Sequence, residues 1–345
     1  MDVLKNQKTD FKEIIYEKSN WVARITINRP QVYNSYSTNA LEELATAFRQ
    51  AAFDDEVAVI VYTGMGDKAF CTGGDVKEYQ ERYTRSPHDY WKYMRLFGAY
   101  IESIVNTGKP VVARINGMAV GGGNESNLAC DLAVIAEHAW VGQVGAGVGS
   151  VAAGGATQWL PITVGDRRAR YMLMTNRRIP AYQALEWGLV NQVAPSVKKD
   201  GAFIEHATPE QIAQAQKGAD GYSIDLSKRD EAVDALAQEL VDKFAECIRF
   251  TKEQINFWKN FSWHQTIGPA RDWLSIHYTS WEPLEGMSAF VEKRPARYRM
   301  LRERAAQGKS SEFIWGAYEK TCPSCGAKAL PEEFTHCGVC GAGLK

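Results

Sequence analysis

The sequence predicts an α/β fold that is followed by a small cysteine-rich module. Residues 57–63 and 111–115 are apolar runs rich in β-branched side chains, as in strands that are covered on both faces. Residues 86–104 lie between them and repeat apolar side chains at helical spacing. Because a strand, a helix and a second strand in this order favour a parallel crossover, we expect a layered α/β core.

The first element that we expect is a β-hairpin over residues 11–28. Its first strand lies near Ile14 and Tyr16, and alternation in the second places Trp21, Ala23, Ile25 and Ile27 on one face. After Ser37-Thr38-Asn39 the period changes to that of a helix, with Asn39 as its predicted cap and Glu42 three residues beyond. The apolar stripe of that helix is Leu41, Leu44, Phe48 and Ala52.

A second helix begins at Ser86-Pro87 and presents Met94, Phe97, Ile101 and Ile104 along one stripe. Residues 195–225 are polar and rich in glycine and lysine, which indicates an inserted excursion. Helical spacing resumes with Val233, Leu236, Leu240, Phe244 and Ile248. For the aromatic side chains between residues 257 and 281, packing or contacts between subunits are favoured over a cofactor site.

Composition limits the classes of partner. The chain has 345 residues, 45% hydrophobic and 23% charged, and a formal net charge of -1. This predicts a globular protein that binds neither nucleic acid nor an anionic membrane through nonspecific charge. Residues 1–5 lack a signal-peptide pattern, and no apolar run is long enough to span a membrane. We therefore expect a cytoplasmic protein in which Cys71, Cys130 and Cys247 are small packing thiols.

The C-terminal module carries two pairs of cysteines with the CxxC spacing, eleven residues apart. Four thiolates from paired tight turns can close a tetrahedral zinc site, and a module of this size is too short to bury a core of its own. We interpret the zinc as structural because no ligand position is left open. A redox dithiol or a disulfide pair is the alternative; Gly326 and Gly341 argue against it, since they free the backbone amides that face the sulfur atoms. The predicted ligands are Cys322, Cys325, Cys337 and Cys340.

Two glycine clusters follow the two apolar strands, at residues 69–75 and 121–125. Each exposes backbone N–H groups, and a pair of such groups, one at a helix N-terminus, forms an oxyanion hole for a carbonyl that gains negative charge. Ordinary tight turns and a phosphate cradle remain alternatives. Neither cluster has the P-loop or the dinucleotide-binding spacing.

The order of these loops resembles the crotonase (enoyl-CoA hydratase/isomerase) superfamily over residues 11–305. The motifs are Gly-Asp-Lys-Ala-Phe-Cys-Thr-Gly-Gly-Asp at 66–75, Ile-Asn-Gly-Met-Ala-Val-Gly-Gly-Gly at 115–123, Cys130-Asp131 and Gly142-Gln143. The resemblance implies a spiral of ββα units with a C-terminal helical region, a trimer or a hexamer, and an acyl-CoA substrate. It places the oxyanion hole at the amides of Gly74 and Gly122, and Asp75 and Lys77 beside the CoA.

The same resemblance identifies one catalytic acid. Glu125 matches the first of the two glutamates with which enoyl-CoA hydratases hold and deliver water. Gly145 stands in place of the second, so a two-glutamate hydratase is not expected and Gly145 is assigned to the substrate-binding loop. Asp131, which follows Cys130 into a strand, is interpreted as structural.

Two branches of the superfamily share further motifs with the chain. Gly149-Ser150 and Tyr278 resemble the dihydroxynaphthoyl-CoA synthase and 2-ketocyclohexanecarboxyl-CoA hydrolase branch, which makes Ser150 and Tyr278 candidate contacts to a substrate oxygen or ring. That branch carries an aspartate where this chain has Ala152. The 6-oxocyclohex-1-ene-1-carbonyl-CoA hydrolases, ring-opening enzymes of anaerobic benzoyl-CoA degradation, resemble more of the chain. The motifs shared with them are Tyr33-Asn34-Ser35-Tyr36-Ser37-Thr38, Lys77-Glu78-Tyr79, Gly154-Gly155-Ala156 and the excursion at 195–225.

We therefore expect an acyl-CoA hydratase or hydrolase that acts on a cyclic enoyl- or oxoacyl-CoA, with structural zinc, CoA as part of the substrate and no redox cofactor. Residues 1–260 form the predicted core, 261–310 a helical region for trimerisation and the active site, and 318–345 the zinc ribbon. Simple enoyl-CoA hydration and synthase-like ring closure are the alternatives within the superfamily. A scaffold that has lost catalysis and docks a partner through the ribbon is the alternative of another class.

Overall fold

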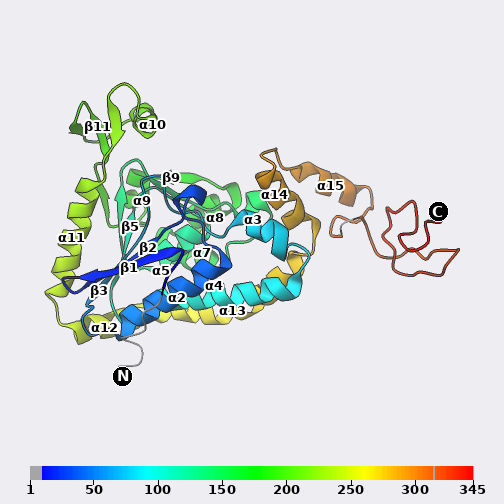
Figure 1. Ribbon diagram of the computed structural model, residues 1–345, viewed down its shortest axis with the longest axis horizontal. Coiled ribbons are helices and arrows are strands. Elements are labelled where there is room, and N and C mark those ends of the chain that lie inside the picture. The colour runs from blue at the N-terminus through cyan, green and yellow to red at the C-terminus, as the bar shows by residue number, and fades with distance from the viewer. Residues whose placement is uncertain (1–9, 314, 345) are drawn as a thin grey trace. The chain divides into compact units, whose positions relative to one another are not determined.

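The computed structural model describes residues 10–313 and 315–344 (Figure 1). The residues on which the signal-peptide expectation rests lie outside these ranges. The chain divides into two units, each described by itself below. The first comprises Met1–Asp75, Lys92–Ala146 and Val151–Arg271, and the second comprises Val76–Trp91, Gly147–Ser150 and Asp272–Lys345. Among the described helices, none combines the length and apolar character needed to cross a bilayer.

A six-stranded sheet organises the first unit. Its order is β1 (Ile14–Ser19), β2 (Val22–Ile27), β3 (Val59–Gly64), β5 (Val111–Ile115), β7 (Leu132–Ala136) and β10 (Gln192–Ala194). The β1–β2 pair is an antiparallel hairpin and the other pairs are parallel. Every residue of β3 is buried, which confirms the strand expected to be covered on both faces. Trp21 differs from the prediction: it lies in the hairpin turn at φ 66° and is 56% exposed.

A second sheet runs through the strands that directly follow β3, β5 and β7. These are β4 (Ala69–Cys71), β6 (Met118–Val120) and β8 (Trp140–Gly142), with β9 (Arg178–Pro180) antiparallel at the edge. Each long strand therefore passes to a short strand of the second sheet and then to helical residues. This repetition is the expected ββα spiral.

Helices cover both faces of the six-stranded sheet. On one face, Val61, Val112 and Val134 pack with Val233 and Ala237 of α11 (Ser227–Val241), which lies beside the sheet in Figure 1. On the other, the ring centroids of Tyr62 and Phe48 are 5.3 Å apart. Phe48 belongs to α2 (Thr38–Phe53), and α4 (Pro87–Val105) adds the predicted apolar stripe. The N-cap of α2 is Ser37, whose Oγ accepts from the amide of Ala40, and not Asn39 as expected.

Residues 195–225 form an ordered excursion. β12 (Ala202–Ile204), β11 (Val197–Lys199) and β13 (Tyr222–Ile224) make a three-stranded sheet that is accompanied by α10 (Pro209–Lys217). Beyond it, the continuous helical spacing expected from Val233 to Ile248 is interrupted. α11 ends at Val241 and α12 (Ala245–Ile255) begins after Phe244, which is 84% exposed.

The remaining helices that lie within the first unit are α5 (Gly122–Ala129), α7 (Ala156–Val164), α8 (Asp166–Thr175) and α9 (Ala181–Glu186). Two more, α6 (Gly145–Val148) and α13 (Phe257–His277), begin there and end in residues of the second unit. The second unit holds α3 (Val76–Glu78), the π-helical turn η2 (Tyr79–Tyr83), α14 (Trp281–Val291) and α15 (Tyr298–Ala306), followed by the cysteine module. Proline sits at the third position of α14, where a missing backbone N–H costs no helical hydrogen bond.

Candidate active site and candidate metal centre

The two glycine loops converge because the strands before them are neighbours. β4 pairs with β6 in parallel, and the chain reaches Gly74 just beyond β4 and Gly122 just beyond β6. Contact between the loops is close: a Cβ on Gly73 would come within 2.9 Å of the Gly122 nitrogen. Gly73 has φ +86°, so glycine is needed there for both conformation and space. The parallel register thus brings together the two predicted oxyanion glycines.

Gly122 is the first residue of α5, after Gly121 at the N-cap with φ 56° and ψ -124°. Its N–H is one of the groups at a helix N-terminus that have no partner within the helix, and the helix dipole adds positive potential there. Gly123 has no room for a side chain, since a Cβ would lie 2.0 Å from the carbonyl oxygen of Cys71. Close packing of glycine backbone therefore fixes the direction of the Gly122 amide.

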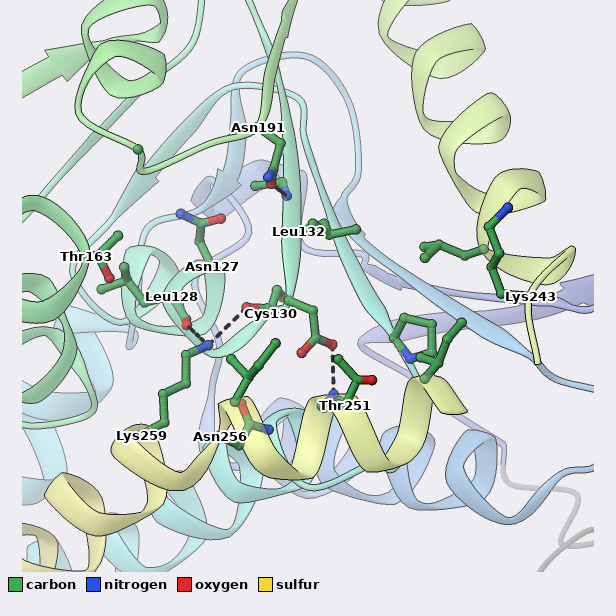
Figure 2. Close-up of a pocket in the computed structure, with 18 of the residues that line it drawn as sticks. Asn127, Leu128, Cys130, Leu132, Thr163, Asn191, Lys243, Thr251, Asn256 and Lys259 are labelled. Atoms are coloured by element: carbon green, nitrogen blue, oxygen red, sulfur yellow. Dashed lines mark hydrogen bonds and ion pairs between the residues drawn. The ribbon is translucent and has the colours of Figure 1, made fainter. Parts of the chain in front are cut away.

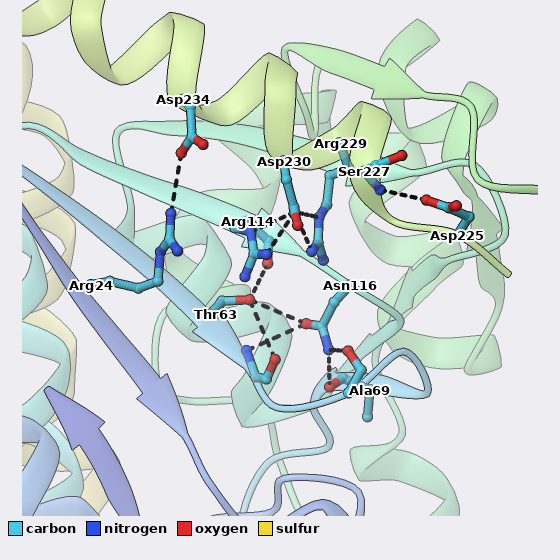
Figure 3. Close-up of polar contacts among 12 residues, drawn as sticks. Arg24, Thr63, Ala69, Arg114, Asn116, Asp225, Ser227, Arg229, Asp230 and Asp234 are labelled. Atoms are coloured by element: carbon cyan, nitrogen blue, oxygen red, sulfur yellow. Dashed lines mark hydrogen bonds and ion pairs between the residues drawn. The ribbon is translucent and has the colours of Figure 1, made fainter. Parts of the chain in front are cut away.

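Polar side chains hold the segment that precedes the first glycine loop. Asn116 Nδ2 donates to the carbonyl oxygens of Gly66 and Ala69, at 2.7 and 2.8 Å, and its Oδ1 accepts from Gly64 N at 3.3 Å (Figure 3). Asn34 Nδ2 also donates to the Ala69 oxygen, at 2.7 Å. Both asparagines are buried. These contacts fix the first residue of β4, Ala69, and the turn before it, so that they position the strand that leads to Gly74.

Glu125 lies one helical turn after Gly122 on α5. It is 5% exposed, and its Oε1 accepts from the backbone N–H groups of Gly154 and Ala156, at 2.8 and 3.2 Å. Burial raises the pKa of Glu125 to about 7, against the opposing effect of the two amides. A carboxyl group with this pKa can both accept and return a proton near neutral pH.

Gly154 leaves the space that Glu125 uses. A Cβ at this position would lie 2.0 Å from the Phe97 ring and 2.9 Å from Glu125 Oε2. Sequence reasoning noted the Gly154-Gly155-Ala156 motif only as part of a resemblance, and it missed the support that this turn gives to the acid. The adjacent glycines before an apolar helix were the available signal.

The other predicted residues of the first unit have structural partners or a loop position. Asp75 Oδ2 accepts from Arg29 Nη2 at 3.1 Å, and Arg29 Nε also contacts Glu13 Oε1 at 3.0 Å. Gly145 is the first residue of α6. Cys71 is fully buried, and burial raises the pKa of its thiol to about 12, which agrees with its interpretation as a packing residue.

The structure places Asp131 in a structural ion pair. Its Oδ2 accepts from Val111 N at 2.7 Å and from Lys252 Nζ at 2.8 Å, while Lys252 also donates to the carbonyl oxygens of Ile104 and Lys109. Both residues line a cavity of about 690 Å³, shown in Figure 2. Lys259 also lines it and donates to Leu128 and Cys130 oxygens at the end of α5. Its lining includes neither the two oxyanion glycines nor Glu125, so this cavity is separate from the glycine loops.

Within the second unit, Ser150 and Tyr278 come together. Tyr278 Oη donates to Ser150 Oγ at 3.1 Å, and the Tyr278 ring stacks on that of Tyr90 with centroids 3.6 Å apart. Tyr278 is fully buried, and burial raises the pKa of its phenol. Lys77, a predicted CoA contact of the same unit, is 72% exposed and lies 3.8 Å from Glu81.

The four C-terminal cysteines form one cluster, with all four Sγ atoms within 4.8 Å of one another. Cys322 and Cys340 Sγ are 3.6 Å apart, and Cys325 and Cys337 Sγ are 3.7 Å apart. Sulfur atoms around a tetrahedral zinc with bonds of about 2.3 Å would lie about 3.8 Å apart. The donor set therefore fits a structural zinc ion, and the cluster is compatible with a zinc ribbon.

The backbone around the cluster repeats in the two halves. Gly326 and Gly341 have φ 74° and 76°, and their amides donate to the carbonyl oxygens of Cys322 and Cys337. The expectation that the glycines free amides toward sulfur is corrected in detail. The amides that donate to sulfur are those of Cys325, at 3.5 Å from Cys322 Sγ, and Val339, at 3.4 Å from Cys337 Sγ. The glycines supply the positive φ that the turns require.

Comparison with known proteins identifies the class. Residues 17–218 match the family model described as enoyl-CoA hydratase/isomerase, and the chain belongs to this family, whose fold and glycine loops it shares. It is a crotonase-family enzyme.

Within this family, the chain is similar to proteins of one particular name. The chain is 35% identical to the 6-oxocyclohex-1-ene-1-carbonyl-CoA hydrolase of Thauera aromatica, over 82% of each chain. It is also 35% identical to the protein of the same name from Geobacter metallireducens, over 78% of this chain and 76% of the relative. Among solved structures, the enoyl-CoA hydratase of Bacillus anthracis matches with a TM-score of 0.60 and 28% identity, over 83% of this chain and 98% of that structure.

Proposed function

We propose that this protein adds water to a cyclic enoyl-CoA that carries a ring oxo group beside the thioester, and then cleaves the ring by hydrolysis. Relatives named 6-oxocyclohex-1-ene-1-carbonyl-CoA hydrolase support the substrate class. The single observation that supports the chemistry best is Glu125, buried, held by two amides and one turn from the Gly122 amide.

In the first half-reaction, the Glu125 carboxylate removes a proton from water as the water oxygen bonds to the β-carbon. The electron pair of the C=C bond moves toward the thioester, whose enolate oxygen accepts hydrogen bonds from the amides of Gly74 and Gly122. Glu125 then returns the proton to the α-carbon. One carboxyl group with a pKa of about 7 serves both transfers, which agrees with Gly145 in the place of a second acid.

The second half-reaction uses the same groups again. Glu125 takes a proton from a second water, whose oxygen bonds to the ring carbonyl carbon. The bond between this carbon and the α-carbon then breaks, leaving a carboxylic acid and the thioester enolate. Because this enolate is the kind formed during hydration, one pair of amides stabilises both steps. Protonation of the α-carbon completes the ring-opened product, which contains two added waters.

In the second unit, Ser150 and Tyr278 form a hydrogen-bonded pair that is a candidate contact to the substrate ring. Asp75 and Gly145 of the first unit and Lys77 of the second remain candidate contacts to the CoA or the substrate. Of these three, Lys77 is the cation and its side chain is 72% exposed, whereas Asp75 is an anion paired with Arg29. We also propose that the four C-terminal cysteines bind a structural zinc ion. A pathway of anaerobic benzoyl-CoA degradation would supply a substrate of this class.

The proposed assembly is a homo-oligomer, a trimer or a hexamer. Its support is an exposed apolar surface on α12 and α13, where Ile255 is 69%, Trp258 61% and Phe261 54% exposed. Large exposed apolar side chains in succession are typical of contacts between chains. Replacing Trp258 and Phe261 with serine is expected to lower the mass measured by light scattering to that of the monomer; an unchanged mass would place the interface elsewhere.

The experiment that tests the function is incubation with 6-oxocyclohex-1-ene-1-carbonyl-CoA and, separately, cyclohexa-1,5-diene-1-carbonyl-CoA, followed by mass spectrometry. A gain of two waters on the first substrate is the expected result. A gain of one water on either would reduce the function to hydration. No reaction with either, while CoA thioesters still raise the melting temperature, would favour the scaffold alternative.

A further inference from the structure

Tyr36 connects the two glycine loops. Its backbone N–H donates to the Gly73 oxygen at 2.9 Å, and its carbonyl oxygen accepts from Asp75 N at 3.0 Å, so that it pairs with Gly74 as an isolated parallel bridge. A shift of Tyr36 would therefore move the Gly74 amide. This backbone pairing accounts for the position of the residue, and its side chain adds a second function.

The Tyr36 side chain reaches from the first glycine loop to the second. A Cβ on Gly122 would lie 1.7 Å from Tyr36 Oη, which means that the phenolic oxygen occupies the space beside the Gly122 Cα. Tyr36 is 2% exposed, and its ring packs against Phe97 and Tyr100, with centroids 5.7 and 5.9 Å away. Phe97 in turn contacts the space left by Gly154, beside Glu125. The hydroxyl is thus held at the meeting point of the oxyanion glycines by packing of its own ring.

The proposed substrate class has a second oxygen to hold. In a thioester with an oxo group on the adjacent ring carbon, both carbonyl carbons are bonded to the same α-carbon. Their oxygens therefore lie within a few ångströms of each other. If the amides of Gly74 and Gly122 bind the thioester oxygen, a donor directly beside Gly122 is placed for the ring oxygen. A neutral phenol is such a donor.

We propose that Tyr36 is a catalytic residue whose hydroxyl donates a hydrogen bond to the ring oxo group and thereby enables ring cleavage. This inference rests on the proposed function. When water bonds to the ring carbonyl carbon, its proton goes to Glu125 and the ring oxygen gains the negative charge, which the Tyr36 hydroxyl stabilises. As the C–C bond breaks, that charge passes through the α-carbon to the thioester oxygen at Gly74 and Gly122. Hydration of the double bond delocalises only part of the enolate charge onto the ring oxygen, whereas attack of water on the ring carbonyl places the full charge there, so cleavage depends on Tyr36 more than hydration does. A substrate without the ring oxo group has no ring oxygen for Tyr36 to stabilise.

The test is Tyr36→Phe, which removes the hydroxyl and keeps the ring packing. With 6-oxocyclohex-1-ene-1-carbonyl-CoA, formation of the two-water product is expected to fall by about 10²–10³-fold, the usual effect of losing one oxyanion donor. The one-water, uncleaved product is expected to accumulate. Wild-type enzyme and Tyr36→Phe are also compared on a second substrate without the oxo group, cyclohex-1-ene-1-carbonyl-CoA, on which their hydration rates should agree.

The matched control is Tyr62→Phe. Tyr62 is also a fully buried tyrosine of this aromatic cluster, and its Oη lies 2.6 Å from Tyr100 Oη. The Tyr62→Phe variant is expected to leave the ratio of one-water to two-water product unchanged.

Equal slowing of both substrates by Tyr36→Phe, or no slowing of either, would overturn the role of Tyr36 and leave the proposed function intact. A wild-type enzyme that converts neither substrate would overturn the proposed function, and this inference with it. Accumulation of the one-water product by Tyr36→Phe alone supports both.

Discussion

Glu125 and the C-terminal cysteines are held in place by different forces. Glu125 and the glycine loops sit among buried strands and helices, where Cβ atoms at Gly122, Gly123 and Gly154 would meet other atoms closer than 3 Å. Among the described residues of the cysteine module, the hydrophobic cluster consists of Cys322, Leu330 and Cys337, with Ala327, Ala342 and Leu344 packed against them. A core of this size cannot offset the conformational entropy of folding.

Because the two regions are stabilised differently, we expect them to respond differently to substitution and to removal of the metal. Packing around Glu125 holds a carboxyl group at a raised pKa, which costs stability and, in the proposed mechanism, provides the group that transfers protons. Metal binding in the cysteine module would supply the folding free energy and would use all four clustered thiols. The active-site region should therefore survive loss of the metal, while the cysteine module should survive loss of Glu125.

The largest expected effect breaks the cysteine module. Replacing Cys337 and Cys340 with serine should remove about one zinc per chain and, with it, binding free energy of about 10–16 kcal/mol that folds such modules. Zinc content by mass spectrometry and limited proteolysis of residues 318–344 measure this. Activity of the core should be largely kept. The control is Cys247→Ser, at an exposed cysteine outside the cluster, which should keep its zinc. Full retention of zinc by the double variant would contradict the assignment.

The next largest effect is expected from a substitution in the candidate active site that leaves the cysteine module folded. Glu125→Gln should reduce turnover by about 10²–10⁴-fold, because the proton acceptor is lost. In the wild type, kcat/KM should rise with pH through about 7, where the carboxylate forms, and this acid limb should be absent from the residual activity of the variant. A variant with wild-type turnover would exclude Glu125 from catalysis.

The stability of the wild-type protein should fall with pH over the range in which its activity rises. Burial raises the pKa of Glu125 from 4.5 to about 7 in the folded protein, so the folded state binds more protons than the unfolded state between these values. Stability is therefore lost as pH rises through this window, by about 3 kcal/mol at most. Glu125→Gln should be more stable than the wild type at pH 8 and gain nothing at pH 4.5. Urea titrations at both pH values measure the difference.

A third substitution lowers the stability of the first unit at a position outside the candidate active site. Lys252→Met leaves the half-buried Asp131 carboxylate without its cation and should lower the free energy of unfolding by about 1–3 kcal/mol, with little change of kcat at low temperature. The matched control is Lys243→Met, at an exposed lysine that lines the same cavity. Equal stability of the two variants in urea would show that the ion pair contributes nothing.

The smallest effect concerns the helix that follows Tyr36. Ser37→Ala removes the side-chain cap of α2 and should cost about 1 kcal/mol. Asn39→Ala, which alters the residue expected from sequence to form the cap, should cost less, because Asn39 is exposed and bonds only to glutamate side chains. Thermal denaturation of the two variants side by side tests this order.

Elements with a local signal could be predicted from the order of the residues alone. Complete burial of β3, the stripe of α4 and the sulfur cluster all follow from periodicity or from spacing along the chain. The ββα spiral and the class of protein came from motifs in a fixed order. Local patterns failed where neighbours compete: both Ser37 and Asn39 can cap a helix, and the backbone conformation selected Ser37.

The surroundings of each candidate reactive group depend on the folded chain and could not be predicted from local patterns. The parallel register of β4 and β6 brings Gly74 to Gly122, and the turn at Gly154 and Ala156 supports Glu125 from 29 and 31 residues away. The hydroxyl of Tyr36 lies beside Gly122. Such contacts depend on strand pairing and close packing between distant segments, and a pKa depends on the burial that results, so no pattern along the chain specifies them.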